Sequence, residues 1–212
     1  MNPLQRFSML LWLLLSHLPP VSTGRLLMPA VFLGGWTALR AAGTPEATAF
    51  VWAAVLAQAA QVWGTLPGTV RRQRRVFGQA RQTFFRAMTI ILGVLAFQIW
   101  YADPSVSQRI ISTCCAAYAG LMVLGIRGDT DILDRFAPVT DDTRVPMSFR
   151  RHLLMMYALV AIMVIAVNET LLVLDAPLST RVATLSLLPV ALHYFFEITL
   201  RLTCPPLEDD ET

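Results

Sequence analysis

Polar and ionisable side chains inside apolar stretches are the residues of this chain that could do chemistry. His193, Glu197 and Arg201 are spaced four residues apart in one apolar run, so on a helix they lie along one face. Asn168 and Glu169 stand together near the end of the preceding run. Such groups are costly in lipid and often mark proton or ion paths. They are also explained by a salt bridge at a helix end with Arg201 reaching the membrane edge, which is the interpretation we favour.

A second candidate is a basic segment that contains Arg71, Arg72, Arg74, Arg75 and Arg81 and has no acidic neighbour. Each arginine near an anionic leaflet contributes about 1 kcal/mol of attraction. The segment therefore suits binding of anionic lipid or of an acidic partner. Determination of membrane topology explains the same residues and is the simpler interpretation.

The sequence predicts neither a metal site nor a cofactor. The segment Asp129–Asp134 is acidic, but a magnesium site needs carboxylates that converge beside phosphate-binding groups. We interpret it as a helix N-cap followed by a solvated loop. The three histidines lie in separate segments, at His17, His152 and His193. The three cysteines lack Cys-x-x-Cys spacing and are interpreted as free thiols. We find no catalytic motif, and predict that the protein is not an enzyme.

Membrane-spanning helices must position these residues. Apolar residues make up 55% of the 212 residues and charged residues only 15%, whereas soluble domains have about 25% charged residues. A spanning helix needs about 20 mostly apolar residues. Six runs approach this length: Leu26–Ala42, Thr48–Leu66, Phe84–Tyr101, Ile110–Ile126, Leu153 to about Leu174, and Val182–Leu200. Short links at Gly43-Thr44-Pro45, Asp103-Pro104 and Asp175-Ala176-Pro177 pair them into three helical hairpins.

The predicted fold is therefore an all-α, polytopic transmembrane bundle with about six spanning helices in residues 25–202. Residues 1–24 form an N-terminal segment whose apolar run, Phe7–Leu15, is too short to span. A retained interfacial helix is our expectation, and a cleaved signal peptide is the alternative. Residues 203–212 form an acidic tail. The turn signal at Pro67-Gly68 predicts that the second helix ends there.

Arginine counts predict the orientation. All 17 basic residues are arginine, and the six-helix arrangement with a cytoplasmic N-terminus places 14 of them on the cytoplasmic side. Only Arg40, Arg109 and Arg181 fall on the outer side. Because arginine is retained on the cytoplasmic side of short loops, both termini are predicted to be cytoplasmic.

The order of these features resembles the intracellular septation protein A family of bacterial inner-membrane proteins. The similar features are Pro29 with Phe32 in the first helix, the basic segment Arg71–Arg75, the pair Arg150-Arg151, Asn168-Glu169 at a helix end, Ser179 in a short turn, and Leu188-Pro189 in the last helix. The resemblance covers roughly residues 25–202. The chain departs from the family's pattern at Ala183, where the family has lysine, and at Ser186, where glycine is usual.

The resemblance implies a non-enzymatic protein of the bacterial cytoplasmic membrane that acts in envelope maintenance or septation through other membrane proteins. We expect contacts with inner-membrane proteins and with anionic lipids. The net charge of +3 is too small to argue for nucleic acid. An accessory subunit or assembly factor of a larger respiratory or photosynthetic complex is an alternative. A small proton- or ion-coupled transporter, resting on Glu169, His193 and Glu197, is a second one.

Overall fold

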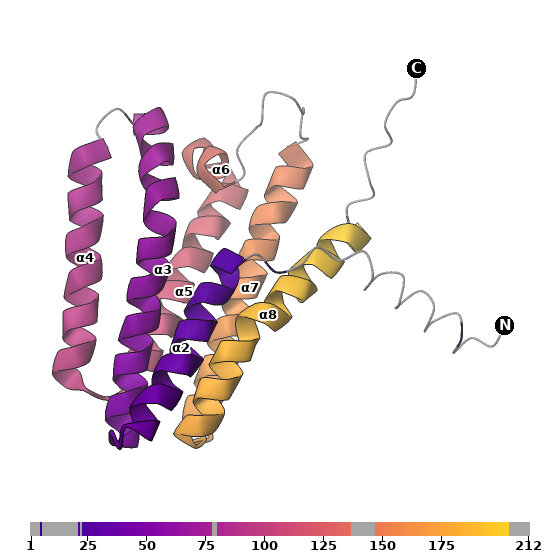
Figure 1. The fold of residues 1–212 in the computed structure, drawn as a ribbon. Helices are drawn as coiled ribbons and strands as arrows, with labels where there is room; N and C mark the ends of the chain where they lie inside the picture. Colours follow the sequence, from indigo (N-terminus) through magenta and orange to yellow (C-terminus); the bar gives the residue numbers. More distant parts are fainter. Residues whose placement is uncertain (1–4, 6–20, 22, 78–79, 137–146, 204–212) are drawn as a thin grey trace. The chain divides into compact units, whose positions relative to one another are not determined.

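The computed structural model describes residues 5, 21, 23–77, 80–136 and 147–203, and all regular secondary structure in the segments between 23 and 203 that it describes is α-helical (Figure 1). The helices are α2 (Thr23–Ala41), α3 (Glu46–Phe77), α4 (Ala80–Tyr101), α5 (Pro104–Arg127), α6 (Thr130–Phe136), α7 (Met147–Val173) and α8 (Leu178–Thr203). The predicted all-α class is confirmed. Residues 204–212 of the acidic tail and nearly all of residues 1–22 lie outside the described residues.

Four helices are long and apolar enough to cross a membrane. Their candidate spans are Glu46–Gly64, Pro104–Arg127, Met147–Val173 and Leu178–Leu200. Two further stretches, Leu26–Ala41 in α2 and Met88–Tyr101 in α4, are apolar but shorter. The prediction of a multi-pass helical membrane protein is therefore confirmed for four of the six runs.

The helix end predicted at Pro67-Gly68 is wrong. Helix α3 continues through both residues to Phe77, and α4 begins at Ala80. A single proline removes only one backbone donor, and the arginines that follow are good helix formers. The basic residues Arg71–Arg75 therefore lie on the last turns of α3, where their side chains are outside the described part of the structure.

The chain divides into two units, and helices α5, α7 and α8 contribute to both. We call residues 22–114 and 165–189 the hairpin unit, because it contains the α2–α3, α4–α5 and α7–α8 turns. We call the described residues of 115–164 and 190–203 the α6 unit.

Two of the three turns in the hairpin unit have the same backbone design. After α2, the N–H groups of Gly43 and Thr44 donate to the carbonyls of Arg40 and Leu39. After α7, the N–H groups of Asp175 and Ala176 donate to the equivalent carbonyls of Leu172 and Leu171. Gly43 and Asp175 both have positive φ, at 81° and 46°. This is the Schellman arrangement that ends a helix on a left-handed residue.

In each of the three turns of the hairpin unit, a proline follows two residues after the residue with positive φ. Pro45, Pro104 and Pro177 stand at the starts of α3, α5 and α8, where the missing N–H costs nothing. In the α4–α5 turn the residue with positive φ is Ala102, at 50°. The turn signals read from the sequence thus correspond to a residue with positive φ followed two positions later by proline.

The apolar core of the hairpin unit joins the first hairpin to α8. It contains Phe32 of α2, Phe50, Ala53, Ala54 and Ala57 of α3, and Val182 of α8. The rings of Phe32 and Phe50 meet edge to face, with centroids 5.4 Å apart. Gly64 of α3 lies close to Leu27 of α2, since a Cβ at Gly64 would lie 2.9 Å from Leu27 Cδ2.

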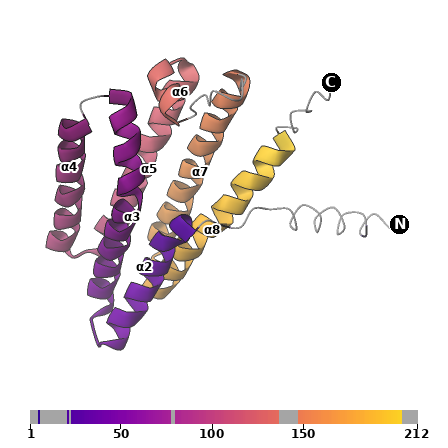
Figure 2. The same cartoon turned by 45° about the horizontal axis from the view of Figure 1, so that its top comes forward.

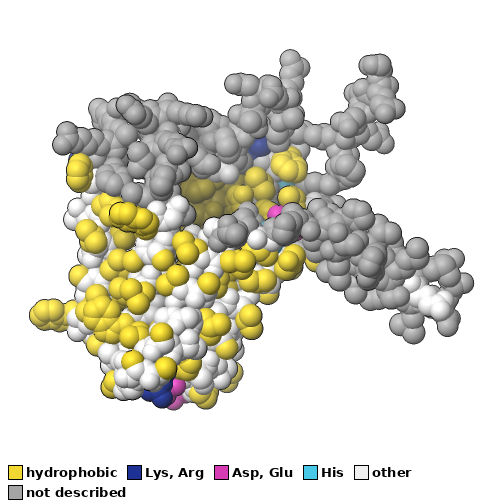
Figure 3. All heavy atoms as spheres, in the orientation of Figure 1, with side chains coloured by type: hydrophobic (Ala, Val, Ile, Leu, Met, Phe, Trp, Pro, Cys, Tyr) yellow, Lys and Arg dark blue, Asp and Glu magenta, His cyan; other side chains and the backbone are white. Residues whose placement is uncertain are grey.

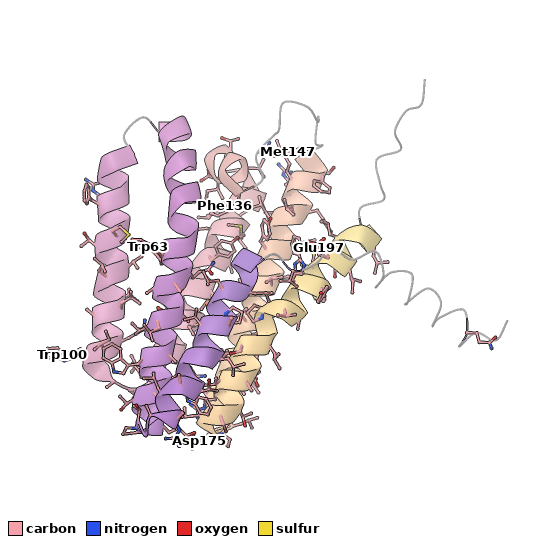
Figure 4. All side chains as sticks on the ribbon, in the orientation of Figure 1. Trp63, Trp100, Phe136, Met147, Asp175 and Glu197 are labelled. Atoms are coloured by element: carbon pink, nitrogen blue, oxygen red, sulfur yellow. The ribbon has the colours of Figure 1, made fainter. Side chains whose placement is uncertain are left out.

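Helix α4 lies beside α3 in both views (Figures 1 and 2) and is the least buried helix of this unit. Among its described side chains, only Gln98 is buried, and Met88, Ile91, Val94 and Leu95 are half-buried. These positions recur every three or four residues and form one stripe. Trp100 is 87% exposed and projects away from the bundle (Figure 4). Figure 3 shows hydrophobic side chains spread over this face.

The α6 unit has its own apolar core of Met122, Leu133, Leu154 and Ala158. Asp129 caps α6: its Oδ1 accepts a hydrogen bond of 3.2 Å from the N–H of Ile132. The acidic segment therefore begins with the N-cap that the sequence predicts. Its next residues form the short helix α6 instead of a loop.

Candidate functional site

A polar network joins three helices in the hairpin unit. Its members are Gln108 and Ser112 in the first turns of α5, Asn168 and Glu169 in the last turns of α7, and Arg181 in the first turn of α8. Four of these five residues are buried, and Glu169 is half-buried. Asn168 and Glu169 were recognised as candidates from sequence, and the structure places both in this network.

Amide groups form the centre of the network. Gln108 Nε2 donates to Asn168 Oδ1 at 3.2 Å. Asn168 Nδ2 donates twice, to the carbonyl oxygen of Gln108 at 2.8 Å and to Ser112 Oγ at 2.9 Å. Both hydrogens and the oxygen of the Asn168 amide are therefore engaged. Because both residues are fully buried, these bonds fix α5 against α7 at one register.

The network ends in a charged group on each side. On one side, Ser112 Oγ donates to Glu169 Oε1 at 2.5 Å. On the other, Arg181 Nη1 donates to Gln108 Oε1 at 3.0 Å. A continuous chain of hydrogen bonds thus runs from the Glu169 carboxylate to the Arg181 guanidinium, by way of Ser112, Asn168 and Gln108.

Arg181 is buried but well satisfied. Its Nε donates to the carbonyl of Ala176 at 2.6 Å, and its Nη2 donates to Asp175 Oδ1 at 2.7 Å. The Arg181 side chain is 6% exposed, whereas the Asp175 side chain is 96% exposed. Asp175 lies in the α7–α8 turn (Figure 4). A buried charge persists only when it is paired and hydrogen-bonded, and here all three guanidinium nitrogens have acceptors.

The first hairpin shows that a hairpin of this design does not need these polar groups. Aligning the two Schellman turns places Trp36 at the position of Asn168 and Ala49 at that of Arg181. Ala49 is fully buried. Since the same turn forms with apolar residues there, the polar residues of the third hairpin serve its contact with α5.

A second polar contact joins α4 to α3. Gln98 Nε2 donates to Gln58 Oε1 at 2.9 Å, and Gln58 Nε2 donates back to Gln98 Oε1 at 3.2 Å. Gln98 is fully buried. Such reciprocal amide bonds hold helices together in lipid.

The other sequence-predicted cluster lies in the α6 unit. His193 Nδ1 and Glu197 Oε1 are 3.9 Å apart, and their side chains are 5% and 20% exposed. The two residues lie one turn apart on α8, where His193 is buried and Glu197 is half-buried. The Arg201 side chain lies outside the described residues. One turn along, the rings of Tyr157 and Phe196 stack with centroids 5.3 Å apart.

Sequence reasoning missed the residues that complete the networks. The predicted site residues do not include Gln58, Gln98, Gln108 and Ser112, and Arg181 enters the sequence analysis only through the arginine count. A usable signal existed: Gln108 and Ser112 are one turn apart in an apolar helix, at the same end as Asn168-Glu169. Within the part of the chain that the structure describes, groups of three or more His, Cys, Asp or Glu able to hold a metal ion are absent.

Comparison of the chain with protein-family models, with curated proteins and with solved structures yields no match. The chemistry of the site must therefore be inferred from its own geometry. In the described bonds, the side-chain N–H groups of Asn168, Gln108 and Arg181 all donate to other groups of the protein. A network of such bonds joins helices to one another.

Proposed function

We propose that this chain is a non-enzymatic integral protein of the bacterial cytoplasmic membrane, acting through contacts with other membrane proteins and with anionic lipids. The observation that carries the proposal is the polar network of Gln108, Asn168 and Arg181. Its buried polar groups bond to one another and hold α5, α7 and α8 together. Among the described residues, large apolar side chains such as Trp63, Ile90 and Trp100 are exposed, as expected of helices that contact lipid or other membrane proteins.

The topology that we propose has six spans and two cytoplasmic termini. The spacing of charged residues along two helices supports this topology. The separation is 18 residues between Arg109 and Arg127 on α5, and again 18 residues between Arg151 and Glu169 on α7. Eighteen residues correspond to about 27 Å of helix. This matches the hydrocarbon core of a bilayer, about 30 Å. The polar network then lies at the outer boundary, where a buried arginine is less costly than at the midplane.

Within this function, envelope maintenance or septation is the role implied by the family resemblance. An accessory subunit of a larger membrane complex is a second candidate, favoured by the exposure of α4. On this helix Ile90, Leu92 and Trp100 are 67%, 57% and 87% exposed. The observation that favours a transporter is the pair of buried His193 and half-buried Glu197.

Purification of the native protein in mild detergent, followed by identification of the chains that co-purify, tests the proposal. We expect membrane proteins in fixed stoichiometry. Division proteins would support the septation role, and a large respiratory or photosynthetic assembly would support the subunit role. Recovery of the chain alone, together with proton-coupled flux in reconstituted vesicles, would contradict the proposal and favour transport.

Lipid contact is tested separately at the basic end of α3. Replacing Arg71, Arg72, Arg74 and Arg75 with glutamine should weaken flotation with vesicles that contain anionic lipid, because each arginine contributes about 1 kcal/mol near such a surface. Flotation with neutral vesicles is the control. Equal flotation of the variant and the unmodified protein with anionic vesicles would show that these arginines do not bind lipid.

A further inference from the structure

We infer that side-chain hydrogen bonds hold the second hairpin, α4–α5, in the hairpin unit. We further infer that the Gln58–Gln98 pair sets the register of α4 along α3. The first and third hairpins are joined by apolar packing instead. The inference concerns the internal assembly of the bundle and does not depend on the proposed function.

The buried residues of each hairpin differ in kind. Every buried described residue of the first hairpin is apolar, from Pro29 and Phe32 in α2 to Ala57 in α3. By contrast, the buried described residues that the second hairpin contributes to this unit are all polar. They are Gln98 of α4 and Ser107, Gln108 and Ser112 of α5.

These polar residues point to two different neighbours. Gln98 bonds Gln58 of the first hairpin, and Gln108 bonds Asn168 and Arg181 of the third. The second hairpin is therefore hydrogen-bonded on one helix to the first hairpin and on the other helix to the third. The first and third hairpins meet each other through Phe50 and Val182 in the apolar core.

In lipid, apolar and polar contacts differ in how strongly they fix the position of one helix against another. Apolar side chains lose little by facing acyl chains, so apolar contact alone weakly selects one position of a helix over another. A buried amide pair is satisfied at only one register, as a single buried polar residue is in a coiled coil. The half-buried stripe of α4 could slide along α3 at small cost without it.

The pair also accounts for how far α4 extends along α3. Gln58 lies 12 residues from the start of α3 at Glu46, whereas Gln98 lies 3 residues from the end of α4 at Tyr101. At about 1.5 Å per residue these lengths are about 18 Å and about 4.5 Å. Helix α4 therefore ends short of the α2–α3 turn, as Figure 1 shows. The bond between the two glutamines sets the depth of the α4–α5 turn.

Thiol crosslinking in the full-length chain tests the inference. In a background with Cys114, Cys115 and Cys204 replaced by serine, Val62→Cys with Val94→Cys places thiols at one level, because 62 and 94 are each four residues from the paired glutamines. Val62→Cys with Ile91→Cys reports a displaced register. We expect Gln58→Leu with Gln98→Leu to lower the ratio of the first crosslink to the second by about threefold or more, given the modest strength of such bonds in membranes.

Two controls make the result decisive. Thr89→Val changes an exposed α4 side chain that bonds only its own helix, at Phe85, and should leave the ratio unchanged. Crosslinking of Trp36→Cys with Leu178→Cys, which pack on the apolar core, should persist in the Gln58→Leu/Gln98→Leu variant. An unchanged ratio would overturn the inference. Loss of the Trp36–Leu178 crosslink would overturn it as well, because the glutamines would then hold the whole unit together.

Discussion

Arg181 and Gln108, 73 positions apart in the chain, are joined by a hydrogen bond of 3.0 Å from Nη1 to Oε1. Gln108 is fully buried and also donates to Asn168. One amide therefore connects the start of α8 to the end of α7 through α5.

We predict that Gln108→Leu destabilises the protein. The substitution removes the acceptor of Arg181 Nη1 and the donor to Asn168 Oδ1, and each buried group left unsatisfied costs about 1–3 kcal/mol. The midpoint of thermal unfolding in detergent should fall clearly. Arg109→Leu, at the neighbouring exposed position, is the matched control and should have a much smaller effect. Equal effects would show that the network contributes little.

Arg181→Lys should destabilise more than Asp175→Asn. Lysine cannot reproduce the fork that bonds Ala176, Asp175 and Gln108 together, so buried acceptors lose their donors at about 1–3 kcal/mol. Asparagine at 175 keeps an acceptor oxygen, and the ion pair that it removes is exposed on the Asp175 side, where such pairs contribute little. Unfolding midpoints of the two variants give the comparison, and the reverse order would contradict this account of the pair.

Gly43→Ala should destabilise by about 1 kcal/mol, because a Cβ at a φ of +81° is unfavourable. The matched control is Gly34→Ala. Gly34 is helical, and a Cβ there has nothing within 4 Å, so alanine should be neutral or slightly stabilising. If both variants unfold at the same temperature, the left-handed turn residue does not limit stability.

Substitutions of Glu197 distinguish a structural role of this residue in the α6 unit from a role in transport. We predict that Glu197→Gln is tolerated, since the amide keeps polar atoms capable of hydrogen bonding at this position, and that Glu197→Leu is less stable. Purified yield and unfolding midpoint measure stability, and growth of a strain that depends on the protein measures function. A stable Glu197→Gln protein with complete loss of function would instead favour a proton path.

Reporter fusions test the orientation. Fusions at Gly128 and at the C-terminus should report the cytoplasm, and fusions near Pro45, Pro104 and Pro177 should report the outside. The physical reason is the excess of arginine on the predicted cytoplasmic side. A fusion near Pro104 that reports the cytoplasm would remove one crossing and contradict the six-span topology.

The sequence by itself determined the six long helices and the turns that join them in pairs, but not the short helix α6. Apolar run lengths and turn residues such as Gly43 and Pro45 act locally, and local signals are readable in one dimension. Even so, the end of α3 was misread, because a proline and a glycine in sequence do not show whether the flanking residues continue the helix.

Only the tertiary structure decided which polar residues work together. Gln108 and Asn168 are 60 residues apart, and Gln58 and Gln98 are 40 apart. Their hydrogen bonds depend on which helix faces are turned towards one another. A glutamine in an apolar run looks the same in sequence whether it meets lipid, a partner or another glutamine. The cost of leaving it unpaired in the membrane favours a hydrogen-bond partner. Which partner it meets is decided only when the helices pack.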